Sequence, residues 1–130
     1  MTPHRILQLN AIATAGCAIG MLATRGILYP LFGLAGPLLL DAIAIGLLAY
    51  AGALAAVAHR PPVSREALLF FTIADGAWVV GSAVVLLMFW SELAASARVL
   101  VIAVAIVVEV FATLQFRAAG HAARRLAPVA

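Results

Sequence analysis

The sequence carries little charge and almost no cysteine. Only 10% of its 130 residues are charged, lysine is absent, and five acids accompany eight arginines. Ordinary globular domains are roughly 25% charged, so the composition argues against a soluble enzyme and against a disordered tail. The single cysteine, Cys17, has no second thiol in this chain with which to form a disulfide or a cysteine-based metal site.

The apolar content is correspondingly high. Hydrophobic residues make up 66% of the chain and the mean hydropathy is +1.17, whereas soluble domains contain roughly 45–50% apolar residues. A domain of this size exposes much of its surface. In a soluble protein, many of these apolar residues would be exposed to water, which is unfavourable. The composition therefore indicates an integral membrane protein with a single domain.

Four apolar runs have the length of about 20 residues that a membrane-spanning helix needs. Proline and glycine residues separate the first run from the second, and Pro61 and Pro62 separate the second from the third. Ser64 can cap the third helix, with Glu66 in its first turn. We predict an all-α fold, a four-transmembrane-helix bundle, as one domain over residues 1–130. Its helices span about 6–28, 38–58, 67–90 and 97–116, and a basic tail covers 117–130.

The arginines are distributed unevenly between the two sides of the predicted bundle. Two of them, Arg25 and Arg98, flank one side, and six flank the other: Arg5, Arg60, Arg65, Arg117, Arg124 and Arg125. Short cytoplasmic loops carry an excess of basic residues. This pattern predicts a multi-pass protein of the bacterial inner (cytoplasmic) membrane with both termini in the cytoplasm.

The basic residues are too scattered to follow a nucleic-acid backbone, so we expect no nucleic-acid partner. The expected partners are the lipid bilayer and either further copies of the chain, as a homo-oligomer, or another membrane protein. Small residues at four-residue spacing, such as Gly16 and Gly20, would let helices approach closely within or between chains.

Two acids fall deep inside predicted spans. Asp75 lies eight residues after Ala67, and Glu109 lies eight residues before Arg117. At a rise of about 1.5 Å per residue, both lie about 12 Å from the cytoplasmic edge. Ionisable residues within a bilayer are rare and usually face the bundle interior. Because no basic residue lies at that depth, we expect at least one acid to be protonated, or both to touch water or a bound cation.

Other polar residues share the same helix faces and the same depth. Thr72 lies three residues before Asp75, and Asn10 and Thr14 lie four residues apart on the first helix. We predict a proton, cation or ligand cluster with these members: Asp75, Glu109, Asn10, Thr14, Thr72 and Trp78. An alternative remains open, in which these polar side chains only hydrogen-bond the helices together and Trp78 fills the core.

A second charged pair is expected at the other side of the bundle. Asp41 lies about one turn into the second helix, and Arg25 lies near the end of the first. An outer ion pair across this hairpin would satisfy both charges and fix the packing of the two helices. A gate or ligand clamp is the functional alternative.

We expect neither catalysis nor a bound cofactor or metal. The histidines, His4, His59 and His121, all lie at the predicted cytoplasmic edge, and no two of them have metal-ligand spacing on one helix. The serines lack a histidine at the same depth on a neighbouring helix, and no glycine-rich phosphate loop is present.

The third and fourth helices also carry a resemblance. The stretch Ala74-Asp75-Gly76-Ala77-Trp78-Val79-Val80-Gly81-Ser82, with a fourth helix that closes on Ala112-Thr113-Leu114-Gln115-Phe116-Arg117, resembles a group of small four-span bacterial membrane proteins of unassigned function. In that group a polar residue precedes the tryptophan by three positions and a serine follows it by four. The resemblance implies the four-helix architecture and no activity. Members of the group often carry Asn where this chain has Asp75, which favours helix bridging over proton transfer there.

Three functional hypotheses follow from the sequence. The first is a non-enzymatic structural or accessory bundle that packs with itself or with a membrane partner. The second is a small proton- or cation-coupled transporter or channel that uses Asp75 and Glu109. The third is a binder of a lipid, quinone or pigment, with an apolar groove near Trp78 and the polar cluster orienting a head group.

Overall fold

The computed structural model describes residues 1–126, and these residues form four α-helices and no strand. The helices are α1 (Pro3–Leu31), α2 (Leu38–Ala58), α3 (Arg65–Met88) and α4 (Ala95–Leu126). All four are long and apolar enough to cross a membrane. The predicted all-α, four-helix architecture is thus confirmed. The last four residues of the predicted tail, 127–130, lie outside the described residues.

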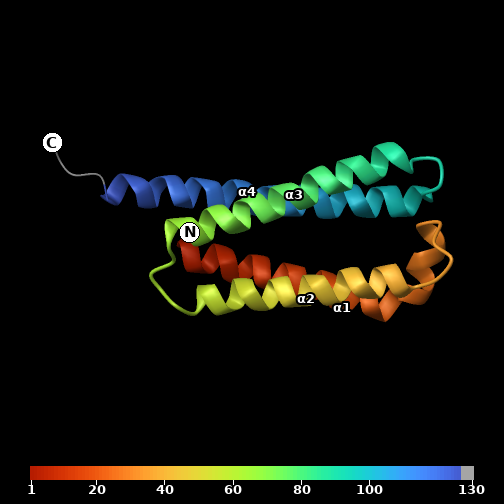
Figure 1. The fold of residues 1–130 in the computed structure, drawn as a ribbon, viewed down its shortest axis with the longest axis horizontal. Coiled ribbons are helices and arrows are strands. Elements are labelled where there is room, and N and C mark those ends of the chain that lie inside the picture. The colour runs from red at the N-terminus through yellow and green to blue at the C-terminus, as the bar shows by residue number, and fades with distance from the viewer. Residues whose placement is uncertain (127–130) are drawn as a thin grey trace.

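The helices form two antiparallel hairpins that lie against each other (Figure 1). α1 packs along α2, α3 packs along α4, and the two hairpins meet through α1 and α4. The N-terminus and the described end of α4 lie at the same end of the bundle (Figure 1). We call this the basic end, because most of the described arginines lie in the helix segments and the loop nearest to it: Arg5, Arg60, Arg65, Arg117 and Arg124. Arg25 and Arg98 mark the opposite end.

The end of α1 differs from the prediction. The helix includes Pro30 and ends at Leu31, beyond the predicted end near Leu28. Gly33 then adopts a φ of 69°, the left-handed conformation that commonly ends helices and favours glycine. A β-carbon at Gly33 would also lie 3.2 Å from the carbonyl oxygen of Glu92, so glycine lets the two loops at the opposite end meet.

The other boundaries follow the sequence more closely. α3 begins after Ser64, whose hydroxyl oxygen accepts a hydrogen bond of 3.1 Å from the backbone N–H of Ala67, and Glu66 lies in the first turn as predicted. α4, in contrast, continues to Leu126 instead of ending near Phe116. Residues 117–126, predicted as a tail, therefore extend the helix.

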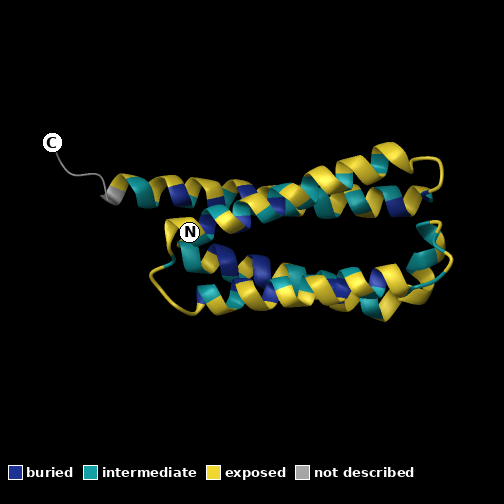
Figure 2. Cartoon of the chain, viewed as in Figure 1, coloured by how far each residue is buried: buried dark blue, intermediate teal, exposed yellow. Residues whose placement is uncertain are grey.

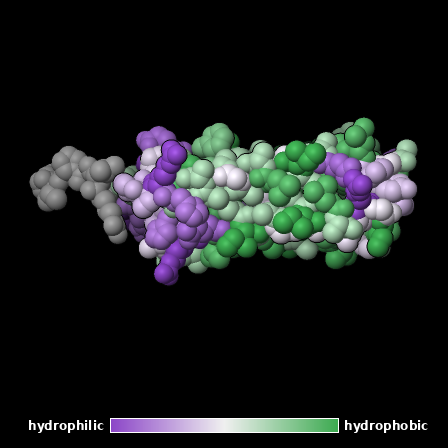
Figure 3. Space-filling view, turned by 90° about the horizontal axis from the view of Figure 1, so that it is seen from below, coloured by the Kyte–Doolittle hydropathy of each residue, from purple (hydrophilic) through white to green (hydrophobic). Residues whose placement is uncertain are grey.

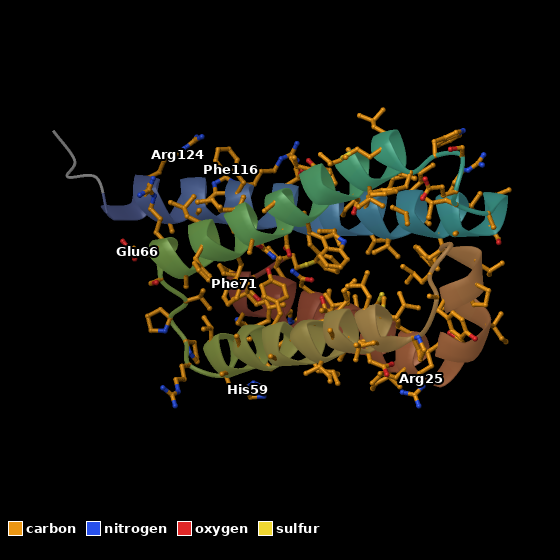
Figure 4. The ribbon with its side chains drawn as sticks, turned by 45° about the vertical axis from the view of Figure 1, so that its right-hand side comes forward. Arg25, His59, Glu66, Phe71, Phe116 and Arg124 are labelled. Carbon is orange, nitrogen blue, oxygen red and sulfur yellow. The ribbon has the colours of Figure 1, made fainter. Side chains whose placement is uncertain are left out.

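The packed core lies in the half of the bundle near the basic end. It joins all four helices through one cluster of buried residues: Leu7, Ala11, Leu54, Ala58, Leu68, Phe71 and Ala119. Figure 4 shows the Phe71 ring directed between the two hairpins, whereas Phe116 and Arg124 point away from the bundle.

The outer faces of the helices are exposed and apolar, the reverse of a water-soluble protein. Most outward residues are exposed (Figure 2), and they include large apolar side chains such as Ile12, Ile73, Leu87 and Phe116. In Figure 3 hydrophobic side chains cover the middle of the molecule, and hydrophilic ones gather toward its ends. Lipid chains would cover such a band, so the surface is that of a multi-pass membrane protein.

Candidate functional site

Asp75 is the point at which all four helices are hydrogen-bonded together. From α1, Asn10 Nδ2 donates to Asp75 Oδ2 at 2.8 Å. From α2, the Tyr50 hydroxyl donates to Asp75 Oδ1 at 2.7 Å. From α4, Gln115 Nε2 donates to Asp75 Oδ2 at 3.0 Å. The Asp75 side chain is buried, with 3% of the residue exposed, and these three donors take the place of water around its carboxyl group.

Further contacts hold the donors in position. The Thr14 hydroxyl, one turn along α1, donates to Asn10 Oδ1 at 3.1 Å, which turns the Asn10 amide group so that its N–H atoms face Asp75. The Tyr50 ring packs edge-on against the Phe71 ring, with 5.7 Å between the ring centroids. The donors to Asp75 are therefore fixed by packing and by hydrogen bonds of their own.

The four residues form one layer across the bundle, which we call the Asp75 layer: Asn10, Tyr50, Asp75 and Gln115. They lie seven, eight, ten and eleven residues from the basic-end termini of their helices. At about 1.5 Å per residue these positions correspond to similar depths. The layer therefore separates the packed core near the basic end from the rest of the bundle.

A cavity begins at the Asp75 layer and extends toward the opposite end. Its volume is about 510 Å³, and residues of all four helices line it. Four small residues, one from each helix, leave this space: Ala13, Gly46, Ala74 and Ala103. A β-carbon built on Gly46 would meet no atom within 4 Å, so the space beside that glycine can accept a side chain.

The cavity wall is almost wholly apolar, and its polar groups are grouped at one end. Asn10, Thr14, Tyr50 and Asp75 contribute to the wall next to the Asp75 layer. Aliphatic residues, Trp78 and Phe111 line the remainder, together with the half-buried Cys17. A mostly apolar pocket with a few grouped polar atoms is typical of sites for small molecules.

The structure does not bring Glu109 to Asp75. Glu109 is exposed on the outer face of α4, where its Oε1 accepts a hydrogen bond of 3.4 Å from the Thr113 hydroxyl. At about 100° per residue, Glu109 is turned by more than 90° from the α4 face that carries Val104, Val108 and Gln115. Because α4 extends to Leu126, Gln115 and not Glu109 is level with Asp75.

The structure places some of the other predicted cluster members beside Asp75 and others away from it. Asn10, Thr14 and Trp78 lie with Asp75 at the cavity. Thr72 does not join them, because its hydroxyl donates to the carbonyl oxygen of Leu68 in its own helix at 2.8 Å. Two further site residues, Tyr50 and Gln115, were not predicted from the sequence. The sequence signal that could have identified them is a polar side chain within an apolar helical segment.

Arg25 and Asp41 form an ion pair across the first hairpin, with 2.7 Å between Arg25 Nη1 and Asp41 Oδ2. At the same end, the Arg98 guanidinium lies 4.5 Å above the Trp90 ring, and its Nε donates to the Leu93 carbonyl oxygen at 3.0 Å. Both arginines of the opposite end are thus held by neighbouring groups and lie away from the cavity.

The histidines take no part in the cavity. His59 Nδ1 lies 2.7 Å from the carbonyl oxygen of Ala55 at the end of α2. Within residues 1–126, no group of three or more His, Cys, Asp or Glu side chains has the geometry of a metal site. Comparison with protein-family models, with curated proteins and with solved structures finds no match to this chain.

Proposed function

We propose that the bundle is a membrane-embedded binding protein for one small molecule with an apolar body and one polar end. The observation that carries this proposal is the cavity of about 510 Å³ that ends at the Asp75 layer. Its volume lies within the range of about 300–1,000 Å³ that is usual for ligand sites. The polar end would orient the molecule, and the apolar walls would provide most of the binding free energy.

The cavity is accessible to an occupant. The space of about 510 Å³ is open on one side and not sealed within the bundle, and several lining residues are exposed. A small molecule could therefore enter it from the surrounding bilayer, and lipid chains would compete for the same apolar walls.

The Asp75 layer supports a structural role beside binding. Its hydrogen bonds join α3 to each of the other helices, as expected for polar groups that hold helices together in a membrane. The separation of Glu109 from Asp75 weakens the case for a transporter based on a pair of acids. We therefore favour binding without catalysis over proton- or cation-coupled transport through two carboxyl groups.

The arginine distribution supports an orientation for this binding protein. With the basic end in the cytoplasm of a bacterial inner membrane, both termini would be cytoplasmic, in agreement with the positive-inside rule. The cavity would then lie near the middle of the bilayer, on the outer side of the Asp75 layer. The exposed apolar faces of the helices leave room for a second copy or a membrane partner.

Cys17, the single cysteine of the chain, provides a direct test, because its thiol belongs to the cavity wall. The protein would be placed in nanodiscs of uncharged lipid, and the rate of Cys17 alkylation by N-ethylmaleimide measured with and without 1-decanol. We expect decanol to slow alkylation severalfold. In Gly46→Leu, whose new side chain would occupy part of the cavity one turn from Tyr50, decanol should slow alkylation much less.

A matched variant controls for the substitution itself. Gly52 lies on the same helix and is exposed, and a β-carbon there would meet no atom within 4 Å, but it does not line the cavity. Gly52→Leu should retain the protection by decanol. If decanol protects Cys17 equally in Gly46→Leu, the protection does not come from the cavity. If neither decanol nor the same chain with another head group protects wild-type Cys17, the cavity is not a binding site.

A further inference from the structure

We propose that the ligand of this cavity carries a protonated amine at its polar end and that Asp75 receives it. This inference rests on the proposed binding function and adds the chemical class of the ligand. It follows from which hydrogen-bonding positions around Asp75 remain open, from the charge of the cavity wall, and from the aromatic rings near the polar end.

The open hydrogen-bonding positions are those of acceptors. A carboxylate offers roughly two acceptor positions on each oxygen. Asp75 Oδ2 accepts from Asn10 and Gln115, whereas Oδ1 accepts only from the Tyr50 hydroxyl in the described part of the chain. Gln115 Oε1 is also buried without a partner among the described residues, but Gln115 does not line the cavity. A ligand that bonds to Asp75 Oδ1 from the cavity must therefore donate the hydrogen bond.

The charge of the cavity wall also favours a ligand that donates hydrogen bonds, and in particular a cation. Among the described residues, Asp75 is the one carboxyl group that lines the cavity, and the lining includes no arginine or histidine. The ion pair that residues 1–126 do contain joins Arg25 to Asp41, near the opposite end of the bundle. An ionised Asp75 therefore has no cationic side chain beside it in the cavity wall. A ligand cation would supply the missing charge, whereas a carboxylate or phosphate anion would be repelled by an ionised Asp75.

Aromatic rings provide a second element that suits a cation. Tyr50, Trp78 and Phe111 all line the cavity, and Trp78 lies one turn from Asp75 on α3. The faces of aromatic rings attract alkylammonium groups, most strongly when water is excluded. An alkylamine could thus place its nitrogen at Asp75 Oδ1 and its chain along the apolar wall toward Cys17.

Three ligands that share a chain and differ in their head groups test this inference. Decylamine is a cation at pH 7.5, 1-decanol is a neutral donor, and decanoic acid is an anion. Their protection of Cys17 against N-ethylmaleimide would be titrated in nanodiscs of uncharged lipid. We expect decylamine to protect at a concentration at least about tenfold lower than decanol, and decanoic acid to protect least.

Two variants separate a specific contact from partitioning into the bilayer. In Asp75→Asn, the advantage of decylamine over decanol should disappear while decanol still protects. A reference protein, Cys17→Ala with Ile19→Cys, presents its thiol on an exposed outer face of α1. Alkylation there should respond equally to all three ligands, and its response would be subtracted.

The outcomes distinguish this inference from the binding function on which it rests. If decanol or decanoic acid protects wild-type Cys17 as well as decylamine does, and Gly46→Leu still weakens protection, the site binds a ligand but the amine is wrong. If none of the three protects, the binding function itself fails. Because the wild-type comparison decides the head group alone, the test stands even if Asp75→Asn does not fold.

Discussion

The Tyr50 hydroxyl reaches from one hairpin to the other and donates a hydrogen bond of 2.7 Å to Asp75 Oδ1. Tyr50 belongs to α2 and Asp75 to α3, two helices that are joined in sequence by the loop at the basic end but that pack with other helices. This contact therefore ties the hairpins together at the floor of the cavity. It also fixes the position of the carboxyl group that lines the cavity.

Removal of that hydroxyl should loosen the bundle. We expect Tyr50→Phe to lower the free energy of unfolding by about 1–2 kcal/mol, because Asp75 Oδ1 would lose its donor in a buried setting. Unfolding in mixed micelles at increasing denaturing detergent would measure the loss. Tyr29→Phe, at the far end of α1, is the matched control and should change stability by less than about 0.5 kcal/mol. Equal losses in the two variants would contradict the role of this contact.

The type of residue at position 75 should matter more than its charge. In Asp75→Asn, the amide oxygen can accept from Asn10 and Gln115, and its N–H can donate to the Tyr50 hydroxyl, which then accepts. We expect this variant to lose no more than about 1 kcal/mol. Asp75→Leu would leave the buried Asn10 and Gln115 amides and the half-buried Tyr50 hydroxyl without their acceptor, and should cost about 3 kcal/mol or more. Similar stabilities of the two variants, measured by the same unfolding assay, would show that the hydrogen bonds of the layer contribute little.

Two polar side chains of α4, Gln115 and Glu109, should respond differently to substitution. Gln115 is fully buried and bonded to Asp75, whereas Glu109 is exposed on the outer face. Gln115→Leu should therefore lower the free energy of unfolding by about 1–2 kcal/mol. Glu109→Gln removes a charge from a surface that faces lipid and should leave stability unchanged or raise it slightly. Thermal unfolding in detergent would compare them, and a larger loss in Glu109→Gln would place that acid in the interior after all.

The sequence predicted the four helices because their signal is strong and local. Runs of about 20 apolar residues, interrupted by proline and glycine, leave few alternatives in a membrane. Ser64 could be identified as a cap for a similar reason, since a cap depends on residues within one turn. The ion pair of Arg25 with Asp41 was accessible because the two residues flank one short connection, so that the hairpin itself brings them together.

The composition of the site depended on quantities that the sequence defines poorly. The depth of a residue on α4 requires the end of that helix, and the basic segment 117–126 is equally compatible with a tail and with a final helical stretch. An end near Phe116 puts Glu109 level with Asp75, while the observed end at Leu126 puts Gln115 there. The rotation of each helix about its axis depends on packing, and a helix that is apolar on all faces carries little sign of it.

The ion pair at the opposite end should contribute little to stability. Arg25 and Asp41 side chains are 52% and 23% exposed, and exposed pairs typically contribute about 0–1 kcal/mol. A double-mutant cycle with Arg25→Gln and Asp41→Asn should give a coupling free energy below about 1 kcal/mol, and the coupling should shrink as salt is added. A coupling of several kcal/mol that persisted in high salt would instead indicate that the pair is shielded from solvent.

Because Gly46 borders the cavity, its replacement by a larger residue should stabilise the protein. Gly46→Leu should raise the melting temperature, because leucine has a higher helix propensity by about 0.8–1 kcal/mol and its side chain would also gain contacts with the cavity wall. Gly52→Leu, on the outer face of the same helix, should gain the propensity alone. The difference between the two melting temperatures in detergent therefore isolates the effect of filling the cavity. Added decylamine should reverse the order of the two variants, since it can stabilise Gly52→Leu by binding but has less room in Gly46→Leu. If the order is the same with and without the amine, then the space beside Gly46 does not receive it.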